Sequence, residues 1–135
     1  MRFKALTGKE KFLNIEANRI DWDKPSLSKF QFNIKQFLKQ YWKGMIVYEE
    51  MPLLGTRLRL DFYNANKKIA VECNGKQHGS YNKFFHGGNT DKYLSQIQRD
   101  DKKYRWCELN NIILVEIEPN DELSPRLFEK FGVEL

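Results

Sequence analysis

The chain has 135 residues, of which 41% are hydrophobic and 30% charged, and this balance is typical of one soluble globular domain. No apolar run approaches the roughly 18 residues of a membrane-spanning helix, and charges interrupt residues 1–22, so neither a membrane anchor nor a secretory signal is expected. Two cysteines are too few for a disulfide framework, which favours a reduced, cytoplasmic protein.

The net charge of +5 is unevenly distributed along the chain. Residues 1–45 carry ten lysines and arginines against four acids, and residues 46–115 carry eleven against eight. Residues 116–135 reverse the balance, with two against six. A basic body with an acidic C-terminal part suits a polyanionic partner such as nucleic acid.

The first elements are an irregular segment and a helix. Residues 1–24 show no clean hydrophobic period, and we expect short strands or an extension that wraps the body. Pro25 and Ser26 then form a helix-start signal for the run PSLSKFQFNIKQFLKQYW. Its apolar residues recur at helical spacing, at Phe30, Ile34, Phe37, Leu38 and Tyr41.

Three strands are expected next, at 45–51, 57–63 and 68–74, with turns around Gly55 and at 64–66. The second strand alternates strictly, with Leu58, Leu60 and Phe62 on one side and a polar face made of Arg57, Arg59, Asp61 and Tyr63. In the third strand, Glu72 shares a side with Ala70 and Asn74. Each of these two strands therefore contains one carboxylate.

A long connection with four glycines, 75–91, follows, and loops of this length are often functional. We then expect a helix from Asp91 to Asn110, an apolar strand at 112–117 and a short C-terminal helix around 125–131. The order α-β-β-β-α-β predicts an α/β fold with a central mixed sheet flanked by helices. Residues 1–135 are interpreted as a single domain, with an extension at 1–24, a core at 26–118 and a tail at 119–135.

The second helix carries an acid on its predicted buried side. One stripe, taken as core-facing, contains Tyr93, Ile97, Asp100, Tyr104 and Cys107, and the adjoining stripe contains Lys92, Gln96, Arg99, Lys103 and Trp106. Asp100 is expected either to support a functional site or to accept hydrogen bonds from a buried partner.

Pairing of the second and third strands would bring Asp61 and Glu72 to the same end of the sheet. Burying a charge is costly unless it is paired or coordinated, so the two acids need a reason to be there. Two hard oxygen ligands close together can bind Mg²⁺ and leave positions open for water and a phosphate. The alternative is two solvent-facing carboxylates on a half-exposed sheet.

The combination RLDFY, KIAVECNGKQH and QIQRDDKKYRWCELNNIILVEI resembles the PD-(D/E)XK nuclease superfamily. The resemblance is greatest to its very-short-patch-repair-like and phage homing endonucleases, and it covers residues 26–118. The matching positions are Asp61, Glu72, Asn74, Gly75, Gln77, His78, Gln96, Arg99, Asp100 and Lys103. The fold it implies is the restriction-endonuclease-like αβββαβ core.

The resemblance implies metal-dependent hydrolysis of phosphodiester bonds, with Asp61, Glu72 and the main-chain carbonyl of Cys73 holding Mg²⁺, for which Mn²⁺ could substitute. The superfamily's lysine, two residues after the glutamate, is Asn74 here. The candidates to replace it as catalytic groups are Lys76, Gln77, His78 and Lys103. Loss of that lysine could also mark an inactive enzyme.

Relatives often carry a glutamate on the first helix, and the best-aligned residue here is Gln31. Glu49 or Glu50, in the first predicted strand, could supply the missing carboxylate. A zinc site made from Cys73, His78, His86 and Cys107 has the wrong spacing.

DNA contacts are expected from cations on the second strand and the second helix, namely Arg57, Arg59, Lys92, Arg99 and Lys103. Residues 79–90 add Tyr81, Phe84 and Phe85, which could stack on bases or plug the core.

The resulting expectation is a Mg²⁺-dependent DNA endonuclease of the homing type, phage-encoded and acting in the host cytoplasm. A DNA junction or mismatch endonuclease is the alternative within that class, and a non-catalytic nucleic-acid-binding module is the alternative outside it. Cutting both strands of a duplex would require a homodimer at this chain length.

Overall fold

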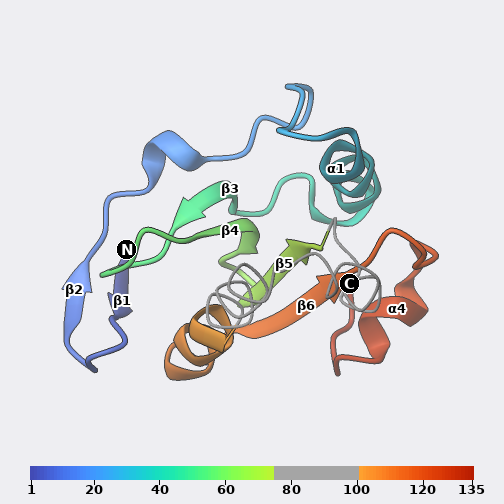
Figure 1. The fold of residues 1–135 in the computed structure, drawn as a ribbon. Helices are drawn as coiled ribbons and strands as arrows, with labels where there is room; N and C mark the ends of the chain where they lie inside the picture. Colours follow the sequence, from blue (N-terminus) through green and yellow to red (C-terminus); the bar gives the residue numbers. More distant parts are fainter. Residues whose placement is uncertain (75–100) are drawn as a thin grey trace, which may run out of the picture.

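The computed structural model of the chain describes residues 1–74 and 101–135 (Figure 1). The described part is a mixed α/β structure. Its elements are β1 (Arg2–Lys4), β2 (Glu10–Phe12), the 3-10 helix η1 (Glu16–Asn18), α1 (Lys29–Trp42), β3 (Val47–Pro52), β4 (Arg59–Asn64), β5 (Ile69–Cys73), β6 (Ile113–Ile117) and α4 (Pro125–Glu129). Residues 101–109 are also helical. No helix among residues 1–74 and 101–135 is long and apolar enough to cross a membrane.

The central sheet has the strand order β3-β4-β5-β6. β3 pairs with β4 and β4 with β5 in antiparallel fashion, whereas β5 and β6 are parallel. A parallel pair needs a crossover connection, and the helix at 101–109 belongs to the segment that joins these two strands. The predicted mixed sheet is confirmed, and so is the predicted order of the elements within the described residues.

Helix α1 begins three residues after the predicted start signal. Ser28, in an extended conformation, accepts a hydrogen bond from the backbone N–H of Gln31, and this cap places the first helical residue at Lys29. The buried side of the helix contains Ile34, Leu38 and Trp42, each fully inaccessible to solvent. The spacing of apolar residues was therefore a better guide to this helix than the Pro25–Ser26 signal.

The sheet is covered on both faces (Figure 1). On one face, Phe62, Val71 and Val115 pack with residues of α1 and α4. On the other face, the hairpin β1–β2 and the helix at 101–109 cover the sheet, and Phe3 contacts Tyr63 edge-to-face at 6.0 Å between ring centroids. Tyr63, which the sequence places on the polar face with Asp61, is only 2% exposed, so this face is covered at that position. The hairpin, formed by the segment without a clean period, buries it.

The helix at 101–109 turns a different side to the core than predicted. Trp106 and Cys107 are buried, whereas Tyr104 is 57% exposed. The Trp106 ring lies 5.1 Å from that of Phe3, so the hairpin provides an apolar partner that the helix sequence alone does not reveal. The core-facing side runs between the two predicted stripes. Asp100 and the other residues of 75–100 lie outside the described residues.

A buried ion pair joins α1 to β3. Lys35 is fully buried, and its ammonium donates to the carboxylate of Glu49 at 2.8 Å and to the backbone carbonyl of Lys24 at 2.7 Å. Glu49 also accepts hydrogen bonds from the Ser26 hydroxyl at 2.6 Å and from the Gln31 amide at 3.1 Å. A charged pair at this depth is tolerated because its polar atoms have partners.

Replacement of Lys35 by methionine should destabilise the protein by about 3 kcal/mol, because the Glu49 carboxylate would remain in place without its ammonium. The matched control is Lys39→Met on the same helix, where the partner Asp23 is exposed and the ion pair contributes little. Urea unfolding monitored by circular dichroism measures both. Equal midpoints for the two variants would contradict the importance of the buried pair.

Candidate functional site

Asp61 and Glu72 lie next to each other where the β4–β5 ladder ends. The last regular pair is Phe62 with Val71, and the same register places Asp61 opposite Glu72. The carboxylates continue the ladder in place of backbone carbonyls. Glu72 accepts the backbone N–H of Asp61 at 3.0 Å, and Asp61 accepts the backbone N–H of Cys73 at 2.7 Å. The structure thus brings together the two acids that the sequence selected.

Lys103 reaches this pair from the helix at 101–109. Its ammonium lies 2.8 Å from the second carboxylate oxygen of Glu72, and the two side chains are 19% and 14% exposed, respectively. The contact is therefore only partly screened by water. Of the four candidates to replace the superfamily's lysine, Lys103 lies within the described residues and contacts the carboxylate pair. Lys76, Gln77 and His78 lie outside the described residues.

The environment of Asp61 favours its neutral form. Burial raises the pKa of its carboxyl to about 7, and the negative charges of Glu72 and Glu50 act in the same direction. The hydrogen bond from the Cys73 N–H and the positive charge of Lys103 oppose the shift without cancelling it. A divalent cation beside the two acids would relieve both their repulsion and their desolvation.

Glu50 is a third acid near this pair, and its negative charge acts on Asp61. The register on either side of it, Glu49 with Phe62 and Met51 with Leu60, leaves Glu50 opposite Asp61. Its φ is +55°, in the left-handed region that a residue other than glycine rarely adopts within a strand. The Glu49 carboxylate is held by Lys35 of α1, whereas Glu50 lies opposite Asp61, so these contacts distinguish the two sequence candidates.

Gln31 occupies the helix position at which relatives often carry a glutamate. It is 4% exposed, and its amide donates both to Glu49 at 3.1 Å and to Glu50 at 3.0 Å. A neutral amide between two carboxylates satisfies oxygens that a further acid would repel. Gln31 therefore connects the buried ion pair with Glu50, the acid opposite Asp61 in the β3–β4 register.

The other predicted contacts divide into two groups. Arg57 and Arg59, near the start of β4, are exposed to solvent. Lys92, Arg99 and Asp100 lie outside the described residues, as do the aromatic residues of 79–90. The cationic contacts that can be placed are therefore Arg57, Arg59 and Lys103.

The donor set at Asp61 suits a hard cation such as Mg²⁺. In the part of the chain that the structure describes, no group of three or more His, Cys, Asp and Glu side chains is arranged to hold a metal ion. The pair Asp61 and Glu72 would need a main-chain oxygen as its third protein ligand. The Asn74 N–H binds the Ile117 carbonyl on β6, so alternation along β5 directs the N–H and C=O of Cys73 to the opposite side, toward β4 and Asp61.

The raised pKa of Asp61 predicts a dependence of stability on pH in metal-free protein. The folded state holds a proton on this carboxyl up to about pH 7, whereas the unfolded chain releases it near 3.8. The stabilising contribution is complete below pH 3.8 and disappears as the pH rises through 7. The stability advantage of Asp61→Asn over the parent should therefore grow by about 1.4 kcal/mol between pH 5 and pH 8, half of what 1.36 kcal/mol per pKa unit would give over the two units from pH 5 to 7.

Urea unfolding in EDTA at both pH values tests this, with Glu122→Gln as the matched control, because Glu122 is an exposed carboxyl. A constant difference between Asp61→Asn and the parent across this range would show that Asp61 titrates normally.

The sequence relatives of the chain are viral proteins. It is 38% identical over 73 residues to uncharacterized protein 033L of Invertebrate iridescent virus 3, covering 54% of this chain and 37% of the viral protein. It is 35% identical over 83 residues to uncharacterized protein 094L of Frog virus 3 (62% and 51%), and 38% identical over 60 residues to uncharacterized protein 307L of Invertebrate iridescent virus 6 (44% and 30%). The chain thus spans about a third to a half of the length of these relatives. No family model and no solved structure matches it.

Proposed function

We propose that the protein is a Mg²⁺-dependent DNA endonuclease with a restriction-endonuclease-like core. The observation that carries the proposal is the pair Asp61 and Glu72, held at the end of the β4–β5 ladder with Lys103 against Glu72. The sheet order and the alternation of helices and strands agree with the αβββαβ core that the sequence resemblance implies. The basic composition of residues 1–115 suits a DNA partner.

Asp61, Glu72 and the Cys73 carbonyl would hold the metal ion. When bound, Mg²⁺ lowers the pKa of a coordinated water and neutralises charge on the scissile phosphate. The chain's own contribution is to keep both carboxylates fixed through the N–H groups of Asp61 and Cys73. Asp61 must lose its proton to serve as a ligand, so metal affinity should increase as the pH rises through 7.

In this proposal, Lys103 takes the role of the superfamily's lysine, whose usual position is occupied by Asn74 in this chain. Its ammonium is already beside Glu72, so it requires no rearrangement to stabilise negative charge that develops on the phosphate. A cation supplied from the helix rather than from β5 explains how the strand position can be Asn without loss of activity. This assignment makes an inactive enzyme the less favoured interpretation.

The viral relatives favour a virus-encoded enzyme that acts in an infected cell. Within that setting, a homing-type endonuclease is our first assignment and a junction or mismatch endonuclease the second, since the same site would serve each. A double-strand cut would use two copies of the chain.

Asp61→Asn and Glu72→Gln should each abolish cleavage and leave DNA affinity within about threefold, because each removes a metal ligand with little change in shape. Plasmid nicking with Mg²⁺, and with EDTA as the blank, measures cleavage, and fluorescence anisotropy in EDTA measures binding. Glu122→Gln is the control. Mg²⁺-dependent cleavage that survives in both variants would refute the site, and DNA binding without any cleavage by the parent would favour a binding module.

Lys103→Ala should slow single-turnover cleavage about a hundredfold, within the 10²–10⁴ range that one positioned group contributes. The neighbouring Lys102→Ala removes an exposed charge of the same kind from the same turn and should have little effect. The variants Lys76→Ala, Gln77→Ala and His78→Ala belong in the same series. If Lys103→Ala cuts at the parental rate and one of these three is slow, the role belongs to that residue instead.

A further inference from the structure

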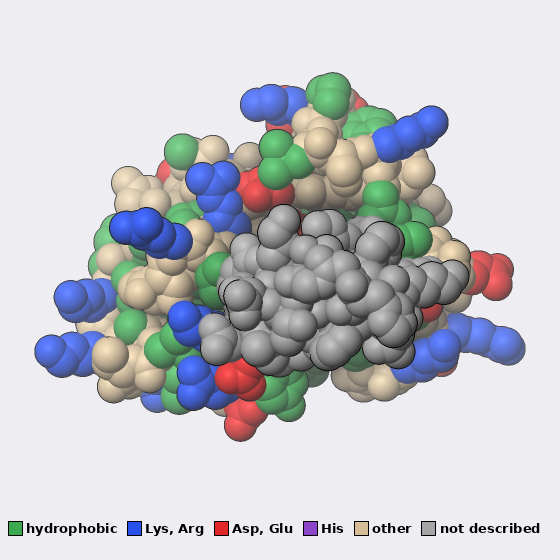
Figure 2. Space-filling model, viewed as in Figure 1, with side chains coloured by type: hydrophobic (Ala, Val, Ile, Leu, Met, Phe, Trp, Pro, Cys, Tyr) green, Lys and Arg blue, Asp and Glu red, His purple; other side chains and the backbone are tan. Residues whose placement is uncertain are grey.

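The hairpin β1–β2 combines positive charge with an exposed aromatic ring. Residues 1–12 contain four cationic side chains and one acid, Glu10, which pairs with Arg2 at 3.0 Å. Phe12 is 65% exposed and lies opposite Arg2 in the hairpin register, so the two project from the same face. Lysine and arginine side chains are visible along this flank of the molecule in Figure 2. Cations interleaved with an exposed aromatic ring are typical of surfaces that bind nucleic acid.

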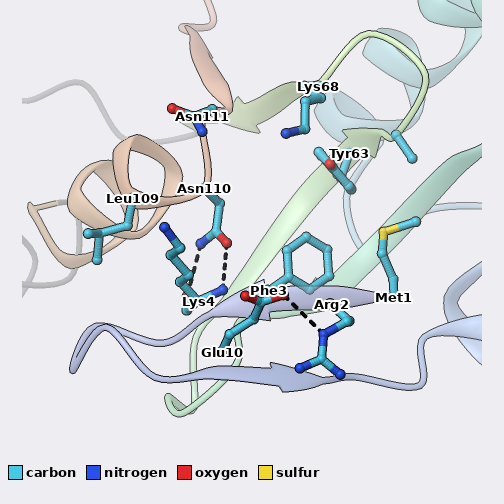
Figure 3. Close-up of a pocket in the computed structure, with 11 residues that line it drawn as sticks. Met1, Arg2, Phe3, Lys4, Glu10, Tyr63, Lys68, Leu109, Asn110 and Asn111 are labelled. Atoms are coloured by element: carbon cyan, nitrogen blue, oxygen red, sulfur yellow. Dashed lines mark hydrogen bonds and ion pairs between the residues drawn. The ribbon is translucent and has the colours of Figure 1, made fainter.

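A hollow of about 340 Å³ lies between the hairpin, the β4–β5 turn and the segment that follows the helix at 101–109 (Figure 3). Lys4 lines it from β1, Lys68 from the β4–β5 turn, and Asn111 from the segment after the helix at 101–109. Both lysines are exposed, and they line the hollow from two sides. Two ammonium groups and an amide around an open depression are suited to a phosphate group.

The hairpin is held rigidly beside the candidate site. The backbone N–H of Lys4 donates to the Asn110 side chain at 2.7 Å, and the Asn110 amide donates back to the Lys4 carbonyl at 2.9 Å (Figure 3). Phe3 packs against Trp106 and Tyr63 on the sheet face that also carries Asp61. The position of the hairpin relative to the carboxylates is therefore fixed by the folded core.

Two internal distances place the hollow a few nucleotides from the carboxylates. Tyr63 is two residues from Asp61 along β4, about 7 Å at 3.3 Å per residue. Asn110 is seven residues from Lys103 along the helical segment, about 10 Å at 1.5 Å per residue. Both estimates place the hollow within about 10 Å of the carboxylates, which is within a few nucleotides of a phosphate held at Asp61 and Glu72.

We propose that the hairpin β1–β2 and its hollow form a DNA-contacting surface that continues the cleavage site. A backbone phosphate a few nucleotides from the scissile one lies between Lys4 and Lys68, and Phe12 packs against bases beyond it. This inference rests on the proposed endonuclease function, because it identifies DNA as the partner of the same face. It assigns a recognition role to residues 1–12, which belong to the segment that the sequence predicts to be short strands or an extension.

The test compares Lys4→Ala/Lys68→Ala with the control Arg126→Ala/Lys130→Ala, which removes two exposed cations from the α4 region. Binding of a short duplex is measured by fluorescence anisotropy in EDTA over a range of salt concentrations. The hairpin double variant should lose about tenfold or more in affinity, and its slope of log K against log salt should fall by about 0.9, because the two lysines contact one phosphate. The control should change affinity less than twofold.

Phe12→Ala provides an independent variant, because stacking is not ionic. We expect at least a fivefold loss of affinity with an unchanged salt slope, because a base would lose its aromatic stacking partner. Thermal melts of all variants confirm folding, since each substitution is at an exposed side chain.

The outcomes separate this inference from the proposed function. A parent protein that binds and cuts DNA, with the hairpin double variant equal to the α4 control in affinity and salt slope, would overturn the hairpin surface and leave the endonuclease intact. A parent that binds no DNA would overturn both. A loss of affinity confined to the hairpin variants supports the surface whether or not cleavage is observed.

Discussion

The register between β4 and β5 is the constraint on which the candidate site depends. Once Phe62 pairs with Val71, the next positions bring Asp61 and Glu72 side by side, whatever that costs electrostatically. The two carboxylates reduce this cost by accepting the N–H groups at which the ladder would otherwise end. The electrostatic cost that these hydrogen bonds leave uncompensated raises the pKa of Asp61 to about 7, through burial and the charges of its acidic neighbours.

Two groups of buried acids have different surroundings in this fold. On the α1 face, Glu49 is matched by the fully buried ammonium of Lys35, so its charge is compensated within the fold. At the end of the β4–β5 ladder, three carboxylates, at Glu50, Asp61 and Glu72, are grouped, and the ammonium that contacts them within the described residues is that of Lys103. The first arrangement stabilises structure, whereas the second retains an excess of negative charge that a cation would neutralise. Gln31 links the two, because its amide reaches both Glu49 and Glu50.

The N-terminal hairpin relates the site to the surface around it. Phe3 inserts between Tyr63 and Trp106, and the paired hydrogen bonds of Lys4 with Asn110 join the hairpin to the helix that carries Lys103. A segment with no internal period thus becomes ordered through contacts with residues far away in the chain. The same contacts hold the hairpin against Tyr63, two residues from Asp61 along β4.

Much of this protein followed from its sequence alone, because local periodicity reflects burial on one side of an element. The spacing of Ile34 and Leu38 predicted α1. The alternation of polar and apolar residues around Asp61 predicted β4 and the side of the strand on which Asp61 lies. The approach of Asp61 and Glu72 could also be predicted, since a short turn between antiparallel strands leaves few registers.

Tertiary structure decided what periodicity cannot express. Alternation places Tyr63 on the side of Asp61, but the hairpin is what covers that side. Likewise, Trp106 is buried against Phe3 of the hairpin, whereas Tyr104 is exposed. The choice between Glu49 and Glu50 likewise required β3 to be oriented against α1, where Lys35 holds Glu49. Each of these depends on contacts between segments distant in sequence, and such contacts leave no regular pattern within either segment.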